Sequence, residues 1–140
     1  MGSVYVLVLK LPSQAEIEVG KLGIFRFQAG FYLYVGSGGE GRFRRYIKGG
    51  RKRWHIDYLL ENAKLCEIWV GEWGECELAE AIKNLGALIP VLKFGSSDCK
   101  CPSHLLYFRD ESFRDFLGRN LRLFWQAHPQ NPTRSDQPSL

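Results

Sequence analysis

The chain has 140 residues and a net charge of +4, and 45% of its residues are hydrophobic and 14% aromatic. This length and composition predict one folded domain with a packed core, and they exclude a chain that is disordered throughout. No stretch approaches the roughly 20 consecutive apolar residues that span a bilayer, so we expect a cytoplasmic protein that does not enter membranes.

The first part of the chain has the pattern of short strands. Val4–Leu11 is a nearly continuous apolar run before a proline, which is typical of a buried strand. Two shorter segments, Ala15–Val19 and Leu22–Phe27, predict an inserted hairpin. Phe31–Val35 consists of aromatic and large aliphatic residues and predicts a strand that ends at Gly36. Short connections of this kind favour antiparallel pairing.

The remaining elements alternate between helical and extended patterns. Apolar residues recur at helical spacing in Arg42–Lys48, His55–Lys64 and Glu75–Leu85. Strands are predicted over Leu65–Val70, near Leu88–Lys93 and over Leu105–Phe108. A last helix is predicted from Asp110 through Leu117 or beyond.

Together these elements predict an α+β fold. Residues 1–127 are expected to form a single domain with a small antiparallel or mixed β-sheet flanked by helices and with the inserted hairpin. Residues 128–140 are rich in Pro, Gln, Asn and Ser without periodicity, which predicts a flexible C-terminal tail.

A glycine-rich turn connects the strand ending at Gly36 to the next helix in the run FYLYVGSGGEGRFRRY. Its glycines allow tight turns and a close approach of the backbone to a bound group. Arg42 and Tyr46 stand four residues apart, so their side chains share one face of a helix. The run predicts a phosphate-handling site, and a plain hairpin before a solvated basic helix is the alternative.

Cations are concentrated in the same region. Seven of the twelve positions from 42 to 53 are basic: Arg42, Arg44, Arg45, Lys48, Arg51, Lys52 and Arg53. Such a cluster predicts electrostatic binding of a polyanion, here nucleic acid. The alternative is a solvated face that only keeps the protein soluble.

Several short motifs resemble those of a known superfamily. Ser3-Val4-Tyr5, Tyr34-Val35-Gly36, Arg42 and Tyr46 resemble, in order, the signature of the GIY-YIG nucleases. The longer motifs WHIDYLL at 54–60 and GSSDCKCPSHLLYF at 95–108 resemble more specifically the DUF123 family, a GIY-YIG-like family whose members occur alone or fused to endonuclease III. The resemblance runs from about Gly2 to Phe108.

This resemblance implies a function and a set of partners. It implies a metal-dependent endonuclease that hydrolyses phosphodiester bonds, with structured or damaged DNA as the expected substrate and with an association with an endonuclease III-type repair enzyme. Three features depart from the superfamily pattern: Ser3 stands where glycine is expected, the gap between Tyr5 and Tyr34 is long, and Pro90 is followed by Val91 rather than by asparagine. A noncatalytic nucleic-acid-binding module on the same fold is therefore the alternative.

The resemblance also implies roles for individual residues. Tyr5 and Tyr34 would flank the scissile phosphate, with Tyr5 as the general base, which requires a cation nearby because the pKa of a free tyrosine is about 10. Arg42 would hold a nonbridging oxygen with its planar guanidinium, and Tyr46 would bind the phosphate or the attacking water. His55, in the WHIDYLL motif at the start of the helix predicted over 55–64, could protonate a leaving group or bind phosphate. Asp57 is either functional or a charge at the helix start.

Two metal sites follow from the sequence. The superfamily holds Mg²⁺ or Mn²⁺ on a glutamate of a later helix, and we prefer Glu77 over Glu75 and Glu80 because it borders the apolar stripe of that helix. Cys99, Cys101 and His104 form a C-x-C-x-x-H arrangement that could hold Zn²⁺, with Cys76 or His55 as a fourth ligand. The alternative is that Ser96, Ser97, Asp98 and His104 shape a loop beside the active site, where their polar groups contact the nucleic-acid substrate or orient His55. A zinc-stabilised interaction protein is a third interpretation of the chain.

Overall fold

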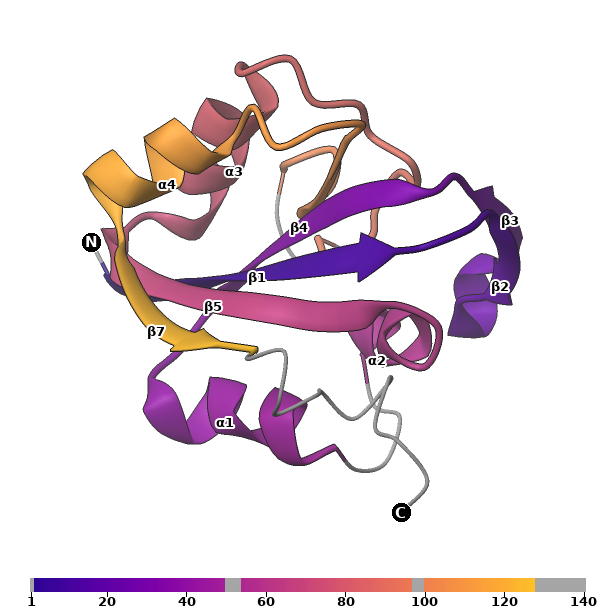
Figure 1. Ribbon diagram of the computed structural model, residues 1–140, viewed down its shortest axis with the longest axis horizontal. Helices are drawn as coiled ribbons and strands as arrows, with labels where there is room; N and C mark the ends of the chain where they lie inside the picture. The colour runs from indigo at the N-terminus through magenta and orange to yellow at the C-terminus, as the bar shows by residue number, and fades with distance from the viewer. Residues whose placement is uncertain (1, 50–53, 97–99, 128–140) are drawn as a thin grey trace.

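The computed structural model describes residues 2–49, 54–96 and 100–127. Its centre is a five-stranded antiparallel sheet with the strand order β6-β4-β1-β5-β7 (Figure 1). The strands of this sheet are β1 (Gly2–Leu11), β4 (Gly30–Ser37), β5 (Lys64–Trp73), β6 (Leu105–Phe108) and β7 (Arg122–Gln126). The predicted α+β class is confirmed, and all pairs of neighbouring strands in the sheet are antiparallel.

The predicted hairpin is present as a separate unit. β2 (Ala15–Glu18) and β3 (Ile24–Phe27) pair only with each other, and the short 3₁₀ helix η1 (Gly20–Leu22) connects them. The hairpin lies beyond the end of β1 and β4, at one end of the sheet (Figure 1). Ile17 and Phe27 turn inward and join the core of the domain.

Helices cover both faces of the sheet. α1 (Glu40–Lys48) and α2 (His55–Leu60) lie on one face, and α3 (Glu75–Lys83) and α4 (Arg114–Asn120) lie on the other (Figure 1). The side chains of a strand alternate between the faces of its sheet, so the central strand β1 contributes to both cores. Tyr5, Leu7 and Leu9 point to the α1 side, which we call the tyrosine face. Val4, Val6 and Val8 point to the α3 side, which we call the valine face.

Local sequence explains where the helices on the tyrosine face begin and end. α1 starts after Gly39, whose backbone is extended, and it ends at Gly49, which has a φ of 86°. Glycine adopts this left-handed conformation without steric cost. α2 is capped at its start by Asp57, because the backbone N–H of Trp54 donates to Oδ2 of that carboxylate at 2.8 Å.

Four predicted boundaries or elements were wrong. The helix predicted over 55–64 ends at Leu60, because Lys64 already pairs with Lys10 in the sheet. The segment near Leu88–Lys93 makes only an isolated bridge between Leu88 and Tyr107 rather than a strand. Pro90 lies inside it and lacks the N–H that a sheet ladder needs.

The end of the chain also differs from the prediction. The last helix begins at Arg114 rather than near residue 110, and the strand β7 that follows it was not predicted. β7 is a short edge strand with mostly exposed or half-buried residues, so it has no alternating pattern to identify it. The predicted tail at 128–140 lies outside the described residues. Within the described segments, none of the helices is long and apolar enough to cross a membrane.

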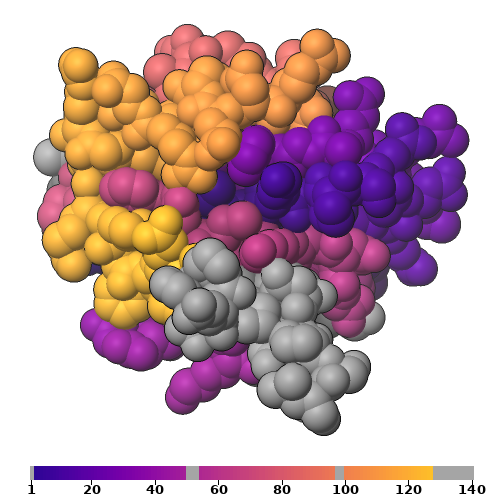
Figure 2. Space-filling model, viewed as in Figure 1, coloured from indigo at the N-terminus to yellow at the C-terminus, as the bar shows by residue number. Residues whose placement is uncertain are grey.

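The space-filling view shows how the edges of the sheet are occupied. α4 and β7, coloured orange to yellow, form one side of the visible face, and the β2–β3 hairpin, in indigo to violet, forms the other side (Figure 2). β7 pairs with β5 through residues such as Trp125, opposite Ile68, and thereby covers an edge that would otherwise expose unpaired backbone groups.

Candidate active site

Three tyrosines predicted from the sequence gather on the tyrosine face. Tyr5 comes from β1, Tyr34 from the neighbouring strand β4 and Tyr46 from α1, and all three are buried. The hydroxyl oxygens of Tyr5 and Tyr46 are 3.0 Å apart and share a hydrogen bond in which either can donate. Their rings are tilted against each other with centroids 5.8 Å apart.

The glycine at the end of β4 makes room for Tyr5. Gly36 pairs with Tyr5 across the two strands, and a Cβ atom on Gly36 would lie 2.2 Å from Cζ of the tyrosine ring. Every side chain larger than hydrogen would therefore displace the ring. The sequence Tyr34-Val35-Gly36 thus serves the site through packing, since its tyrosine joins the cluster and its glycine admits a second tyrosine.

A charged pair supports this cluster from α1 and α2. Arg45 donates from Nη1 to Oδ1 of Asp57 at 3.1 Å and from Nη2 to Oδ2 at 3.3 Å. The same Nη2 lies 3.3 Å from the hydroxyl of Tyr46, and the guanidinium stacks 4.3 Å from the centroid of that ring. Asp57 is buried, so its charge is neutralised within the protein by a paired cation and by the N–H of Trp54.

Arg42 is placed at the rim of the cluster. Its side chain is exposed, and Nη1 donates to the carbonyl of Ser37 at 3.1 Å. The guanidinium carbon lies 6.0 Å from the centre of the Trp54 ring. Its positive charge acts on Tyr5, where it lowers the pKa of the phenol against larger opposing effects. Arg42 is thus an exposed cation next to the tyrosine cluster, where a phosphate-binding arginine was predicted.

The remaining predicted nucleic-acid-binding arginines and lysines lie on α1 or just after it in the sequence. Arg44 forms an ion pair with Glu40 one turn earlier and lies 5.3 Å from the centre of the Phe124 ring. Lys48 is exposed at the end of the helix. Arg51, Lys52 and Arg53 lie outside the described residues.

Tyr5 and Tyr34 are held in their neutral form. Burial, with a further contribution from the charges of Tyr46 and Tyr34, raises the pKa of Tyr5 far above its usual value. Burial also raises the pKa of Tyr34, and the charges of Tyr46, Glu75 and Asp57 add to the effect. The sequence analysis required a cation to lower the pKa of Tyr5 for a role as general base. The observed shift has the opposite sign, because desolvation outweighs the charge of Arg42.

His55 lies beside Tyr34 and is fixed by the loop that follows α3. Its Nδ1 accepts a hydrogen bond from the N–H of Gly95 at 3.0 Å, so a neutral imidazole carries its proton on Nε2. Burial lowers the pKa of His55, which favours this neutral form. Gly95 packs against Tyr34, since a Cβ atom there would lie 2.7 Å from Cε1 of the tyrosine.

The glutamates of α3 are arranged differently from the expectation. Glu77, the preferred metal ligand, is exposed on the first turn of a helix that packs on the valine face, and within the described residues it makes no ion pair. Glu75 instead is half-buried, with Oε2 at 3.4 Å from Nδ1 of His104. The charge of Glu75 reaches Tyr34, as the raised pKa of that phenol indicates. The metal role of Glu77 stays a prediction.

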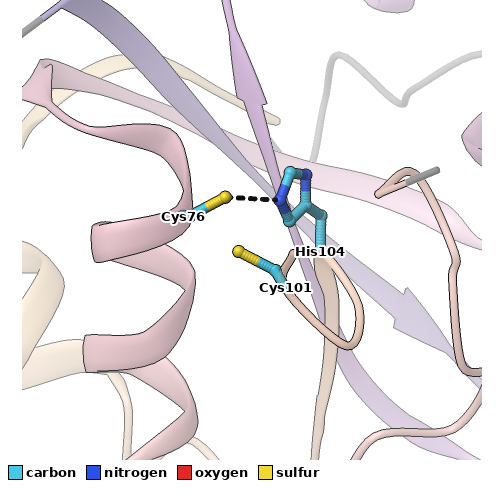
Figure 3. Close-up of side chains that lie close together, drawn as sticks. All are labelled: Cys76, Cys101 and His104. Carbon is cyan, nitrogen blue, oxygen red and sulfur yellow. Dashed lines mark hydrogen bonds between the residues drawn. The ribbon is translucent and has the colours of Figure 1, made fainter. Parts of the chain in front are cut away.

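A second group of reactive side chains lies next to α3. Cys76, Cys101 and His104 each offer one ligand atom, these atoms lie within 4.8 Å of one another, and the group could hold a metal ion. The three side chains point toward one another from α3 and from the loop before β6 (Figure 3). His104 is buried and both cysteines are half-buried. Cys99 lies outside the described residues, and Cys76, named from the sequence as a possible fourth ligand, is a member of this group.

A cavity of about 410 Å³ opens on the other side of the glycine turn. It is lined by the turn residues Gly38 and Gly39, by Phe43 of α1 and by Phe124 of β7. Its lining includes none of Tyr34, Tyr46 and His55, so the cavity reaches the glycine turn and not the tyrosine cluster.

Sequence reasoning missed three contributors to the site. Arg45 was assigned only to nucleic-acid binding, although it also pairs with Asp57 and contacts Tyr46. The ring of Phe94 packs against those of His55 and Tyr34, and Gly95 donates its N–H to His55, so these two residues form a wall of the cluster. The presence of Gly95 at the start of the second long motif is the one signal that could have identified this wall.

The fold and this site define an α+β domain in which a buried tyrosine cluster, flanked by arginines, lies across the sheet from α3 and its thiol and imidazole group. The chain belongs to the DUF123 family, whose model, described as "Domain of unknown function DUF123", matches residues 4–124. No curated protein and no solved structure gives a significant match.

Proposed function

We propose that the protein is a metal-dependent endonuclease of the GIY-YIG type that hydrolyses phosphodiester bonds in nucleic acid, with structured or damaged DNA as its substrate in repair. The observation that carries the proposal is the convergence of Tyr5, Tyr34 and Tyr46 on one face of the sheet, with Arg42 at their rim. Tyr5 comes from a distant part of the sequence to join Tyr34, Arg42 and Tyr46, and hydrolysis of a phosphate ester needs such donors and cations around one centre.

In this proposal the tyrosines act as hydrogen-bond donors. Their raised pKa values keep Tyr5 and Tyr34 protonated at neutral pH, so each can donate to a phosphoryl oxygen. Arg42 neutralises a nonbridging oxygen from the exposed rim. The neutral ring of His55 donates from Nε2, because Nδ1 already accepts from Gly95. Arg45 positions Tyr46 through its contacts with the ring and the hydroxyl.

Glu77 is the proposed ligand of Mg²⁺ or Mn²⁺. The donor type fits, since Mg²⁺ usually takes one or two carboxylates together with waters and substrate phosphates, and the side chain of Glu77 is accessible. When bound, such an ion supplies a water of lowered pKa and polarises the phosphoryl oxygen. Glu75 is already directed at His104, which leaves Glu77 or Glu80 as the accessible carboxylate on α3.

The second candidate is a noncatalytic nucleic-acid-binding module. Two observations favour it: burial removes the basicity that Tyr5 would need as a general base, and the described contacts do not connect Glu77 with the tyrosines. Basic residues of α1 would then hold the phosphate backbone without cleavage, in a complex that an endonuclease III-type enzyme completes. Both candidates predict binding that weakens steeply with added salt.

A cleavage assay separates the two candidates. Labelled single-stranded, duplex, flapped and branched substrates of DNA and of RNA are incubated with the protein and either Mg²⁺ or Mn²⁺. We expect metal-dependent cleavage that falls by roughly 10²- to 10³-fold in Arg42→Ala, the usual cost of removing one preorganised charge-stabilising group. Arg119→Ala is the matched control, because this exposed arginine lies on α4 at the valine face.

The outcomes assign the roles. Glu77→Ala should abolish cleavage and preserve binding, and normal cleavage by this variant would move the metal to Glu80 or Glu75. Loss of cleavage in Arg42→Ala and in Arg119→Ala alike would point to general loss of charge rather than to a clamp. Binding of every substrate without cleavage under either metal would establish the binding module instead.

A further inference from the structure

We propose that Cys76, Cys101 and His104 bind a zinc ion with a structural role, separate from the divalent ion of the proposed nuclease reaction. The proposal does not depend on that reaction. It begins with the ligand atoms. Sγ of Cys76 lies 3.8 Å from Nε2 of His104, and the sulfur of Cys101 lies within the same 4.8 Å group.

The separation of the ligand atoms of Cys76 and His104 is close to that of a tetrahedral site. Zinc binds cysteine sulfur at about 2.3 Å and histidine nitrogen at about 2.0–2.1 Å, so two neighbouring ligand atoms of a tetrahedron are about 3.5–3.8 Å apart. The observed separation between Cys76 and His104 needs only a small adjustment to receive the ion. Figure 3 shows that the two sulfurs and the imidazole nitrogen face a common point.

The charge of Glu75 favours one tautomer of His104. Its other ring nitrogen, Nδ1, lies 3.4 Å from Oε2 of Glu75 in a geometry that is not yet a hydrogen bond, and the nearby carboxylate favours a proton on Nδ1, which leaves Nε2 as the metal ligand. A carboxylate in this position fixes the tautomer and the ring orientation of histidine ligands in many metal sites. The backbone is fixed too, since N–H of His104 donates to Phe94 and its carbonyl accepts from Val35, both at 2.9 Å.

The donor chemistry selects the metal. Two thiolates and a neutral imidazole are soft or borderline ligands, which zinc prefers and magnesium does not. The two thiolate charges also neutralise the ion in a half-buried site beside the buried ring of His104. The described residues supply three ligands, and the fourth corner of the tetrahedron is left for water or another donor.

The structural role follows from what the three ligands connect. Cys76 belongs to α3 on the valine face, whereas Cys101 and His104 belong to the segment that returns to β6. The preceding residues Phe94 and Gly95 of that segment contact His55 and Tyr34. Since residues 91–96 and 100–104, the described parts of this loop, lie in no helix or strand, a metal bond would fix Cys101 and His104 to α3 and thereby help to hold Phe94 and Gly95 against the tyrosine cluster.

Metal analysis of the full chain tests the proposal. The protein is purified under reducing conditions without chelator, supplied with zinc, freed of excess metal and measured by elemental analysis. We expect stoichiometric zinc in the wild type and in Cys66→Ser, a matched control in which the cysteine of β5 lies outside the group. Cys76→Ser and Cys101→Ser should each lose most of the metal while remaining folded by circular dichroism.

Cobalt spectroscopy reports the coordination geometry of the site directly in the wild-type protein. Cobalt in the wild-type site should show the intense absorption of tetrahedral coordination and a charge-transfer band from its thiolates, and Cys76→Ser should weaken that band. Glu75→Gln should keep the stoichiometry but lower zinc affinity by roughly 10- to 100-fold, as expected for a positioning residue. A folded wild type that retains little zinc, an octahedral cobalt spectrum, or full zinc in both Cys76→Ser and Cys101→Ser would overturn the proposal.

Discussion

The two faces of the central sheet share a strand and differ in chemistry. On the valine face, Val4, Val6 and Val8 of β1 meet apolar residues of α3 and α4. On the tyrosine face, the alternate residues of the same strand begin with Tyr5, and three phenols and the ion pair of Arg45 with Asp57 lie within or against the core. The first face is mainly apolar, and its buried carboxylate, Glu67 of β5, pairs with Arg114 of α4, whereas the second buries a cluster of phenols together with an ion pair, and these polar groups must each be satisfied.

This difference indicates that the valine face serves mainly stability, whereas the tyrosine face also carries the candidate site. A buried hydroxyl or carboxylate contributes little net stability and costs free energy when its partner is lost, so a core made for stability alone would not contain them. The buried carboxylate of the valine face, Glu67, is matched by Arg114, so it is the clustering of three phenols that gives the tyrosine face a reason beyond stability for its composition. Substitutions on the two faces should separate stability from function.

The largest loss of stability is expected on the valine face. Leu117→Ala removes a fully buried side chain of α4 and should lower the free energy of unfolding by about 2–5 kcal/mol, through lost apolar burial and the cavity that remains. Urea denaturation measures the change. Leu123→Ala is the control, because this leucine of β7 is 39% exposed and should cost far less. Nucleic-acid binding by folded Leu117→Ala should equal that of the wild type, and a large loss of binding would contradict the separation of stability from function between the two faces.

A smaller loss is expected where the tyrosine face is most tightly packed. Gly36→Ala places a methyl group into the ring of Tyr5 and should cost about 1–3 kcal/mol of stability through overpacking. Unlike Leu117→Ala, it should also impair any activity of the site, because the Tyr5 hydroxyl must leave Tyr46. Denaturation and the cleavage or binding assay are measured together. Unchanged stability would show that the ring moves freely.

The two faces should also respond differently to alkaline pH. Above about pH 10 the unfolded chain loses its tyrosine protons, whereas burial keeps Tyr5 and Tyr34 protonated in the folded protein. The unfolded state then binds fewer protons, so stability falls as pH rises, by at most about 1.4 kcal/mol per pH unit for each tyrosine. Tyr34→Phe should reduce this slope in urea denaturation between pH 9 and about pH 11. Leu117→Ala should lower the whole curve with its slope unchanged.

The smallest effect is a gain. Gly118 lies in α4 with no atom near the position of a Cβ, so Gly118→Ala should stabilise the protein by about 0.5–1 kcal/mol through helix propensity. Thermal unfolding detects it, and activity should not change. This variant is also the control for Gly36→Ala, since both add one methyl group. A loss of stability at Gly118 would mean that the helix is strained there.

Much of the fold could be predicted from the sequence because periodicity reports burial. β1 and β4 are strongly apolar, and α1 and α3 have clear helical stripes, so these elements were placed within a few residues. β7 failed because an edge strand needs only one partner and carries no required alternation. The end of α2 failed because Ala63 is buried in a turn and fits helical spacing equally well.

The sequence identified the tyrosines of the cluster, but it did not predict the protonation state of Tyr5. Local motifs named Tyr5, Tyr34 and Tyr46, and the fold brings them to one face. The sign of the pKa shifts of Tyr5 and Tyr34 depends on how deeply each phenol is buried, which no motif records. Likewise, the sequence offered both roles for Asp57, and the structure gives it a helix cap and an ion pair at once.

The self-contained pairing of the β2–β3 hairpin has a consequence for how the chain can vary. Leu11 and Gly30 close the β1–β4 ladder before the hairpin begins, so the ladder sets the distance between Tyr5 and Tyr34, whatever the number of residues between them. Insertions at the exposed residues 12–14, outside the buried positions of the hairpin, should therefore be neutral for the site, whereas a single residue added between Tyr5 and Leu11 would turn one set of side chains to the wrong face. The long interval between the two tyrosines is a place where the protein can acquire new surface without altering the tyrosine cluster.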